Sequence, residues 1–194
     1  MGCFPDTNGL ALGRARSGKS YAFAANSGTD DVSVIDLDSL ADNKTAEIAR
    51  IPTQIGPWGI ASSPDGRYIV AANRESQRVA FEGNTVSIID VENPTVEAAR
   101  VLVGTTDPNV QTRPFIPSFT PDGKEVVVPN FRTNVVSIVD LHAALANPAN
   151  GVVATIPLVR PGGGPARPKG SAVTADGRYA VISGGARTTR SWPQ

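Results

Sequence analysis

Short apolar runs separated by turn residues follow one another along the chain, and residues 57–91 show the pattern best. There PWGIASS leads into the turn Pro64-Asp65-Gly66, which is followed by YIVAAN, a polar loop and TVSIIDV. Asp-Gly between two apolar runs predicts a hairpin, because glycine tolerates the positive φ that a tight turn needs. The near-continuous run YIVAAN predicts a strand covered on both faces, and VSIID predicts a strand ending on an aspartate that can cap the next turn.

The same units recur through the sequence. The turn glycines Gly18, Gly66, Gly123 and Gly177 are 48, 57 and 54 residues apart. A repeat of this length with four short strands predicts the blades of a β-propeller, so the expected fold is all-β. We expect one partial propeller domain over residues 1–194, with blades at 8–55, 57–104 and 114–159, an incomplete blade at 168–184, and a tail at 185–194. The only helical turn expected is Leu141 to Ala146.

SPDGRYIVAAN, followed after its loop by NTVSIIDV, resembles the YVTN-type β-propeller repeat, and the resemblance covers residues 8–184. It implies a seven-bladed ring, similar to the haem d1-binding propeller of cytochrome cd1 nitrite reductase and to lactonase-type propellers. It also implies structural roles for the motif residues: turn glycines such as Gly66, asparagines and aspartates that end strands (Asn73, Asn130, Asp36, Asp90 and Asp140).

The blade count falls short of such a ring, because about three and a half blades are present. An open half-ring leaves exposed blade faces. We interpret the chain first as a fragment of a longer protein. The alternative is self-association through the open blade edges, in which two copies form one ring.

Composition narrows the partners and cofactors. Lys+Arg and Asp+Glu both number 18, so no nucleic-acid partner is indicated. Cys3 and His142 are single, which excludes most zinc sites by counting, and no cofactor is assigned. No apolar run is long enough for a membrane span. The family resemblance implies a periplasmic or secreted protein, although the N-terminus lacks a signal peptide, which we attribute to truncation.

Several apparent sites have plainer explanations. Residues 13–20 match the phosphate-binding pattern GxxxxGK[ST], but the repeated turn accounts for them and no long helix follows. Trp58 and Phe115 occupy equivalent positions, for which packing between blades is favoured over ligand stacking. His142 is interpreted as a surface or capping residue. Solvated turn carboxylates are favoured over a Ca²⁺ site for Asp30, Asp31, Asp36, Asp38 and Asp42. Few aromatic residues lie among the basic residues of the C-terminal stretch, so nucleic-acid binding is not favoured there. These basic residues are Arg160, Arg167, Lys169, Arg178, Arg187 and Arg190. Residues 160–170 are interpreted as a flexible connection.

No nucleophile–base pair stands out, so no catalytic, cofactor-binding or metal-binding residue is assigned. The prediction is a non-enzymatic binding or scaffold module that recognises a protein or a small ligand through rim loops. The alternative is a fragment of a propeller enzyme, either a haem d1-type oxidoreductase domain or a lactonase-like hydrolase. Function is expected in the segments that do not repeat, 74–83 and 105–113, and in the blades that a complete ring would add.

Overall fold

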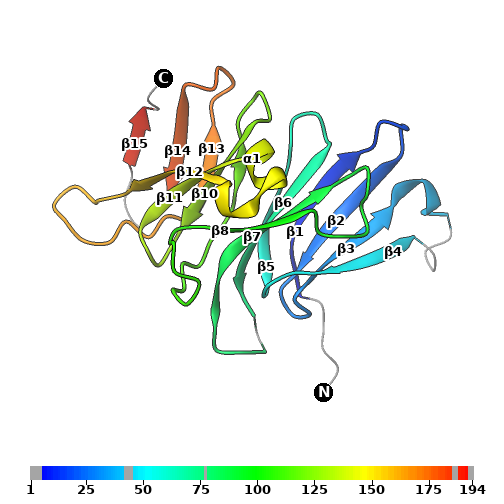
Figure 1. Cartoon of the computed structure of the whole chain (residues 1–194), viewed down its shortest axis with the longest axis horizontal. Helices are drawn as coiled ribbons and strands as arrows, with labels where there is room; N and C mark the ends of the chain where they lie inside the picture. Colours follow the sequence, from blue (N-terminus) through cyan, green and yellow to red (C-terminus); the bar gives the residue numbers. More distant parts are fainter. Residues whose placement is uncertain (1–5, 42–45, 77, 185–187, 192–194) are drawn as a thin grey trace.

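Four antiparallel sheets follow one another along the chain in a computed structural model that describes residues 6–41, 46–76, 78–184 and 188–191. In every sheet each strand pairs with the next strand in sequence, and Figure 1 shows the sheets arranged side by side as an open fan. The all-β fold is therefore confirmed, and the open arrangement is that of an incomplete propeller. Sheet 1 contains β1 (Thr7–Arg14), β2 (Ser20–Asn26), β3 (Asp31–Asp36) and β4 (Glu47–Pro52); sheet 2 contains β5 (Pro57–Ser62), β6 (Tyr68–Glu75), β7 (Glu82–Asp90) and β8 (Ala99–Leu102); sheet 3 contains β9 (Ser118–Phe119), β10 (Glu125–Asn130), β11 (Val135–Asp140) and β12 (Val152–Pro157); sheet 4 contains β13 (Gly170–Val173), β14 (Tyr179–Ser183) and β15 (Thr188–Ser191).

The expected helical turn is present as α1 (Leu141–Ala146), and short 3-10 turns lie at Leu37–Ser39 and Pro148–Asn150. Asp140 caps α1, since its Oδ1 accepts a hydrogen bond from the Ala143 amide at 2.7 Å. Among the described residues, no helix is long and apolar enough to cross a membrane. Sheet 4 differs from the sequence prediction: β15 pairs with β14 in a segment that was expected to be a tail.

The repeated motif residues have structural roles. In the hairpin turns, Gly66, Gly123 and Gly177 all have φ between 70° and 72°. The aspartate before each glycine accepts a hydrogen bond from the amide two residues further on, at 3.1 Å in each turn. Asn73 does not end its strand, because β6 continues to Glu75. Its buried side chain instead donates to Thr85 and Ser87 on β7, at 2.8 and 3.0 Å.

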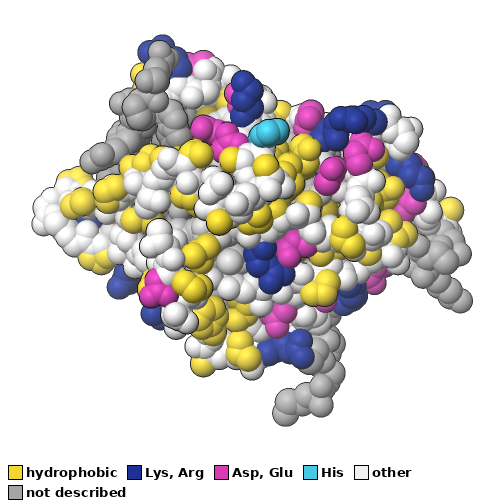
Figure 2. All heavy atoms as spheres, viewed as in Figure 1, with side chains coloured by type: hydrophobic (Ala, Val, Ile, Leu, Met, Phe, Trp, Pro, Cys, Tyr) yellow, Lys and Arg dark blue, Asp and Glu magenta, His cyan; other side chains and the backbone are white. Residues whose placement is uncertain are grey.

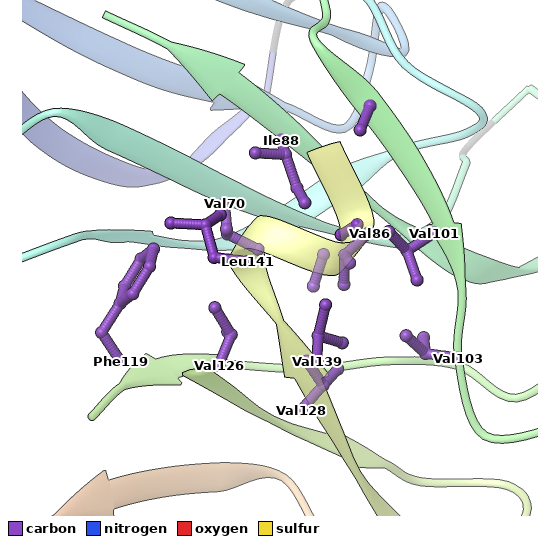
Figure 3. Packing of buried hydrophobic residues seen from close by; sticks show 13 residues of the cluster. Val70, Val86, Ile88, Val101, Val103, Phe119, Val126, Val128, Val139 and Leu141 are labelled. Atoms are coloured by element: carbon purple, nitrogen blue, oxygen red, sulfur yellow. The ribbon is translucent and has the colours of Figure 1, made fainter. Parts of the chain in front are cut away.

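Alternate residues of each central strand face opposite neighbouring sheets. In β6, Ile69 and Ala71 pack into the cluster between sheets 1 and 2, whereas Val70 and Ala72 pack into the cluster between sheets 2 and 3. Figure 3 shows the second cluster, with Val70, Val86 and Ile88 opposite Val126 and Val139. The core is thus divided into layers between successive sheets, which explains why the central strands are apolar on both faces.

The two ends of the strands form two rims with different contents. The β2–β3, β6–β7 and β10–β11 loops lie on one rim, toward the lower edge of Figure 1, together with the segments that lead into β5, β9 and β13. We call this the loop rim. The tight hairpin turns and α1 lie on the opposite rim, toward the upper edge of the figure, which we call the turn rim.

Candidate functional site

A buried arginine lies between two aromatic rings at the loop rim. Arg74 is near the end of β6 and only 7% exposed. Its Cζ atom lies 3.8 Å from the ring centroid of Trp58 on β5 and 4.2 Å from that of Phe115, just before β9. Guanidinium groups at these distances are attracted by the π-electrons of both rings. The equivalent aromatic positions noted in the sequence therefore enclose a charge rather than packing only on each other.

The stack continues toward sheet 4. The rings of Phe115 and Phe131 are 5.6 Å apart between centroids, and the Cζ of Arg113 lies 5.3 Å from the Phe131 centroid. Arg167 Cζ and Lys169 Nζ each lie 5.7 Å from that same centroid. With the neighbouring Glu75, Glu82 and Arg132, these residues form what we call the rim cluster: Trp58, Arg74, Glu75, Glu82, Arg113, Phe115, Phe131, Arg132, Arg167 and Lys169.

Positive charge exceeds negative charge within the rim cluster. Glu75 lies 2.7 Å from Arg74 Nη1 and 2.5 Å from Arg113 Nη2. Glu82 lies 3.2 Å from Arg113 Nη1 and also pairs with Arg132. The cluster's four arginines and its lysine thus outnumber its two carboxylates, which leaves a local surplus of positive charge. The whole chain is formally neutral, so this surplus is a property of the rim and not of the composition.

Three guanidinium nitrogens in the rim cluster have no hydrogen-bond partner. The Nε atoms of Arg74 and Arg113 are buried and have no hydrogen-bond partner. Arg74 Nη1 is within ion-pair distance of Glu75 but is not aligned with it for a hydrogen bond. Burial lowers the pKa of Arg74, and the nearby Arg113 lowers it further. Unsatisfied buried donors next to excess positive charge favour an incoming acceptor group.

A hollow of about 410 Å³ opens beside these side chains. Its lining comes from four segments that are distant in sequence: Glu82; Arg113; Phe131, Arg132 and Asn134; Pro165 and Arg167. Arg167 is held there through its backbone, since its amide donates to Asn134 Oδ1 at 2.8 Å. Three arginines and an aromatic ring line this hollow together with Glu82, and guanidinium groups can bind a carboxylate or phosphate through paired N–H donors.

The backbone that presents Arg113 and Arg167 belongs to the repeat. Asp6, Gly56, Arg113 and Arg167 occupy the same position before each innermost strand. Asp6, Arg113 and Arg167 have positive φ values of 47°, 54° and 48°. The Arg113 carbonyl accepts from the Phe131 amide at 3.0 Å, as the Asp6 carbonyl accepts from Ser27 at 3.1 Å. The left-handed conformation thus recurs at three of the four positions, with Gly56 as the exception, and the side chain at this position is what distinguishes one sheet from another.

Sequence reasoning found part of this site. The segments 74–83 and 105–113 contribute Arg74, Glu75, Glu82 and Arg113. It missed Phe131 and Arg132, and it interpreted the segment carrying Arg167 and Lys169 as a connection only. The repeat alignment contains a usable signal. The residue after the repeated asparagine (Asn26, Asn73 or Asn130) is Ser27, Arg74 or Phe131, so this rim position changes from sheet to sheet while its surroundings repeat.

The other sequence candidates lie elsewhere. Residues 15–19 form the β1–β2 turn, where Lys19 pairs with Asp36 at 3.2 Å. Asp31 and Asp36 are buried, so they are not the solvated carboxylates expected, and Asp42 lies outside the described residues. In the described part of the chain, no group of three His, Cys, Asp or Glu side chains could hold a metal ion. His142 is exposed on α1 at the turn rim (Figure 2), far from the loop rim.

A second hollow, of about 320 Å³, lies between sheets 3 and 4 at the turn rim and is acidic. Glu125 lines it with Asp122 and Asp176. Burial raises the pKa of Glu125, and the charges of Asp122 and Asp140 raise it further. Because these causes destabilise only the ionised form, they mark a carboxylate that weakens the fold at neutral pH.

Replacing Glu125 with glutamine is therefore expected to stabilise the protein near neutral pH. A raised folded-state pKa favours the protonated form, so the gain from Glu125→Gln should be full above the folded pKa. It should shrink as the pH falls, and vanish below about pH 4, where the unfolded carboxyl is also protonated. Urea unfolding of both proteins, at neutral pH and below about pH 4, measures the difference in the free energy of unfolding. Asp38→Asn, at an exposed carboxylate, is the control; an equal gain there, or a gain that persists in acid, would contradict the assignment.

Comparison with known proteins gives the fold but no activity. No protein-family model matches the sequence, and no curated protein matches it. Among solved structures, the chain is similar to a functionally unknown protein from Desulfotomaculum acetoxidans DSM 771, with a TM-score of 0.59 and 21% identity. The match covers 90% of this chain and 48% of the other, so this chain spans about half the length of that protein.

Proposed function

We propose that this chain is a binding module, of the YVTN-type propeller kind, whose loop rim holds an anionic ligand. The observation that supports the proposal is the rim cluster itself. Cations from three sheets converge there on stacked aromatic rings, with only Glu75 and Glu82 to balance them. The repeat motifs that resemble the YVTN type support the family assignment.

The chemistry of the cluster favours binding over catalysis. Its members are arginines, a lysine, glutamates and aromatics, without a histidine, cysteine or serine that could act as a nucleophile or as a haem ligand. Arginine offers a planar set of N–H donors that matches a carboxylate or phosphate, and the aromatic rings lower the local dielectric constant around the bound charge. The ligand we propose is thus a small anion or an anionic group on a partner.

Location follows from the family proposal rather than from the site. We propose a periplasmic or secreted protein, because YVTN-type repeats imply that location. Immunoblotting of fractionated source cells tests it, and recovery in the cytoplasmic fraction alone would reject it.

Trp58 provides a direct assay for anion binding. In a Trp192→Phe background, Trp58 is the remaining tryptophan, and its ring lies against Arg74. Titration with inorganic phosphate and with citrate is expected to change its fluorescence in a saturable way, and added chloride salt should weaken the binding because the charges are partly exposed. Arg167→Gln is expected to weaken binding by about tenfold, the effect of losing one charged hydrogen bond.

The matched control is Arg160→Gln, since Arg160 is an exposed arginine of the same connecting segment but not a member of the rim cluster. It should leave the affinity unchanged. Equal losses in the two variants would indicate nonspecific charge attraction. The absence of a fluorescence change and of calorimetric heat with both anions would overturn the proposal.

A further inference from the structure

Each sheet has two faces that take different parts in packing. We call the face toward the next sheet the forward face and the other the backward face. Phe23, Val70 and Val127 occupy the same position in β2, β6 and β10, and all three are 0% exposed against the following sheet. Every contact between sheets thus joins a forward face to a backward face, so the interface is heterologous.

The forward face of sheet 4 has no such cover. Val181 is the β14 equivalent of Val70, and it is 46% exposed. Tyr179, the equivalent of the half-buried Tyr68, is 41% exposed. The opposite face of β14 is covered as in the other sheets, because Ala180 and Ile182 are buried against sheet 3. The exposure is therefore confined to one face of a well-packed sheet.

The backward face of sheet 1 is open in the complementary way. Leu10 on β1 corresponds to Ile60 on β5, which packs against the cluster between sheets 1 and 2. Leu10 is 70% exposed and Leu12 is 64% exposed. Arrays of stacked repeats usually end in polar capping faces, and large apolar side chains at both ends indicate that each face has a partner.

We propose that the partner is a second copy of this chain, bound head to tail at both ends. The forward face of sheet 4 in each copy would pack on the backward face of sheet 1 in the other, which closes the two chains into one ring. The three interfaces between sheets within one chain identify this partner. A forward face is complementary to a backward face of the same repeat, and this chain carries one open face of each kind.

Two copies are sufficient for closure, because one chain has one open forward face, at Val181, and one open backward face, at Leu12. Ring closure also removes both open ends at once, whereas a single contact would leave two ends exposed and permit open chains to grow. The inference is independent of the ligand proposed for the loop rim, because Leu12 and Val181 are not members of the rim cluster.

Light scattering coupled to size-exclusion chromatography tests the stoichiometry, and the full chain is expected to run as a dimer. Leu12→Asp and Val181→Asp should each give monomers, because each of the two contacts contains Leu12 of one copy and Val181 of the other, so either change damages both contacts. An equimolar mixture should recover dimers. The unmodified Val181 face of one variant and the unmodified Leu12 face of the other still form one good contact.

Val153→Asp is the control, since Val153 is 53% exposed on β12, away from both end faces, and it should leave the dimer intact. Circular dichroism checks that each variant folds, and the milder pair Leu10→Ser and Tyr179→Ser repeats the test if the aspartates unfold the chain. A monomer for the unmodified chain, or a dimer unaffected by Val181→Asp, would overturn the proposal. Oligomers that grow with concentration would overturn ring closure, and the failure of the mixture to recover dimers would overturn the head-to-tail arrangement.

Discussion

Replacing Gly56 with alanine is expected to destabilise the protein by at least about 3 kcal/mol, which is severe for the addition of one methyl group. A Cβ atom at Gly56 would lie 1.6 Å from the carbonyl oxygen of Glu75 and 2.3 Å from its carbon. These are backbone atoms, and the Gly56 carbonyl accepts from the Arg74 and Glu75 amides at 3.1 and 3.3 Å. The two segments can separate only by breaking those hydrogen bonds and displacing Glu75 from the rim cluster.

Urea unfolding followed by circular dichroism measures the loss. The control is Gly162→Ala, at a glycine with φ of 85° and open space around it. That change should lower the free energy of unfolding by only about 1–2 kcal/mol, the strain of placing alanine in the left-handed conformation. A loss at Gly56 no larger than the loss at Gly162 would mean that the backbone of Glu75 can move aside, and that its close approach does not make glycine necessary at position 56.

Replacing Arg74 is expected to separate the stability of the rim from its affinity for anions. Arg74→Met fills most of the space between Trp58 and Phe115 and removes a buried charge, so stability should change by less than about 1 kcal/mol. Arg74→Ala leaves a gap between the rings and should cost about 2–4 kcal/mol. Both variants remove the same positive charge, and both should weaken phosphate and citrate binding by about tenfold.

Thermal unfolding and the anion titration, both in the Trp192→Phe background, measure the two effects. If Arg74→Met proves as unstable as Arg74→Ala, the charge of Arg74 stabilises the fold. The presence of an arginine at position 74 would then be explained without a ligand. If Arg74→Met binds anions as tightly as the unmodified chain, the buried guanidinium takes no part in the site. The expected outcome is a stable protein with a weakened site.

The strands were predictable from the sequence because their signals are local. Asp-Gly turns, the apolar runs and the strand-end aspartates each depend on residues a few positions apart, and β3, β7 and β11 end at Asp36, Asp90 and Asp140 as expected. The strand β15 was missed because Thr188–Ser191 lacks the apolar alternation, and its pairing with β14 is provided by the neighbouring strand.

The site was harder to predict because its residues look ordinary one at a time. Arg74, Phe115 and Phe131 lie in or beside repeated strands, where an aromatic residue usually indicates core packing. Arg167 belongs to a segment rich in glycine and proline. Their association depends on three sheets bringing corresponding rim positions together, and no spacing within one repeat contains that information.

The sequence by itself determined the repeat, the all-β class and the two loops that were expected to carry function, because periodicity and turn chemistry are properties of neighbouring residues. Only the tertiary structure decided that a formally neutral chain concentrates positive charge at one rim. It also decided which apolar side chains remain exposed on the end faces. Both depend on how successive sheets stack, and the sum of charges or exposed surface at one place is set by contacts between residues distant in the chain.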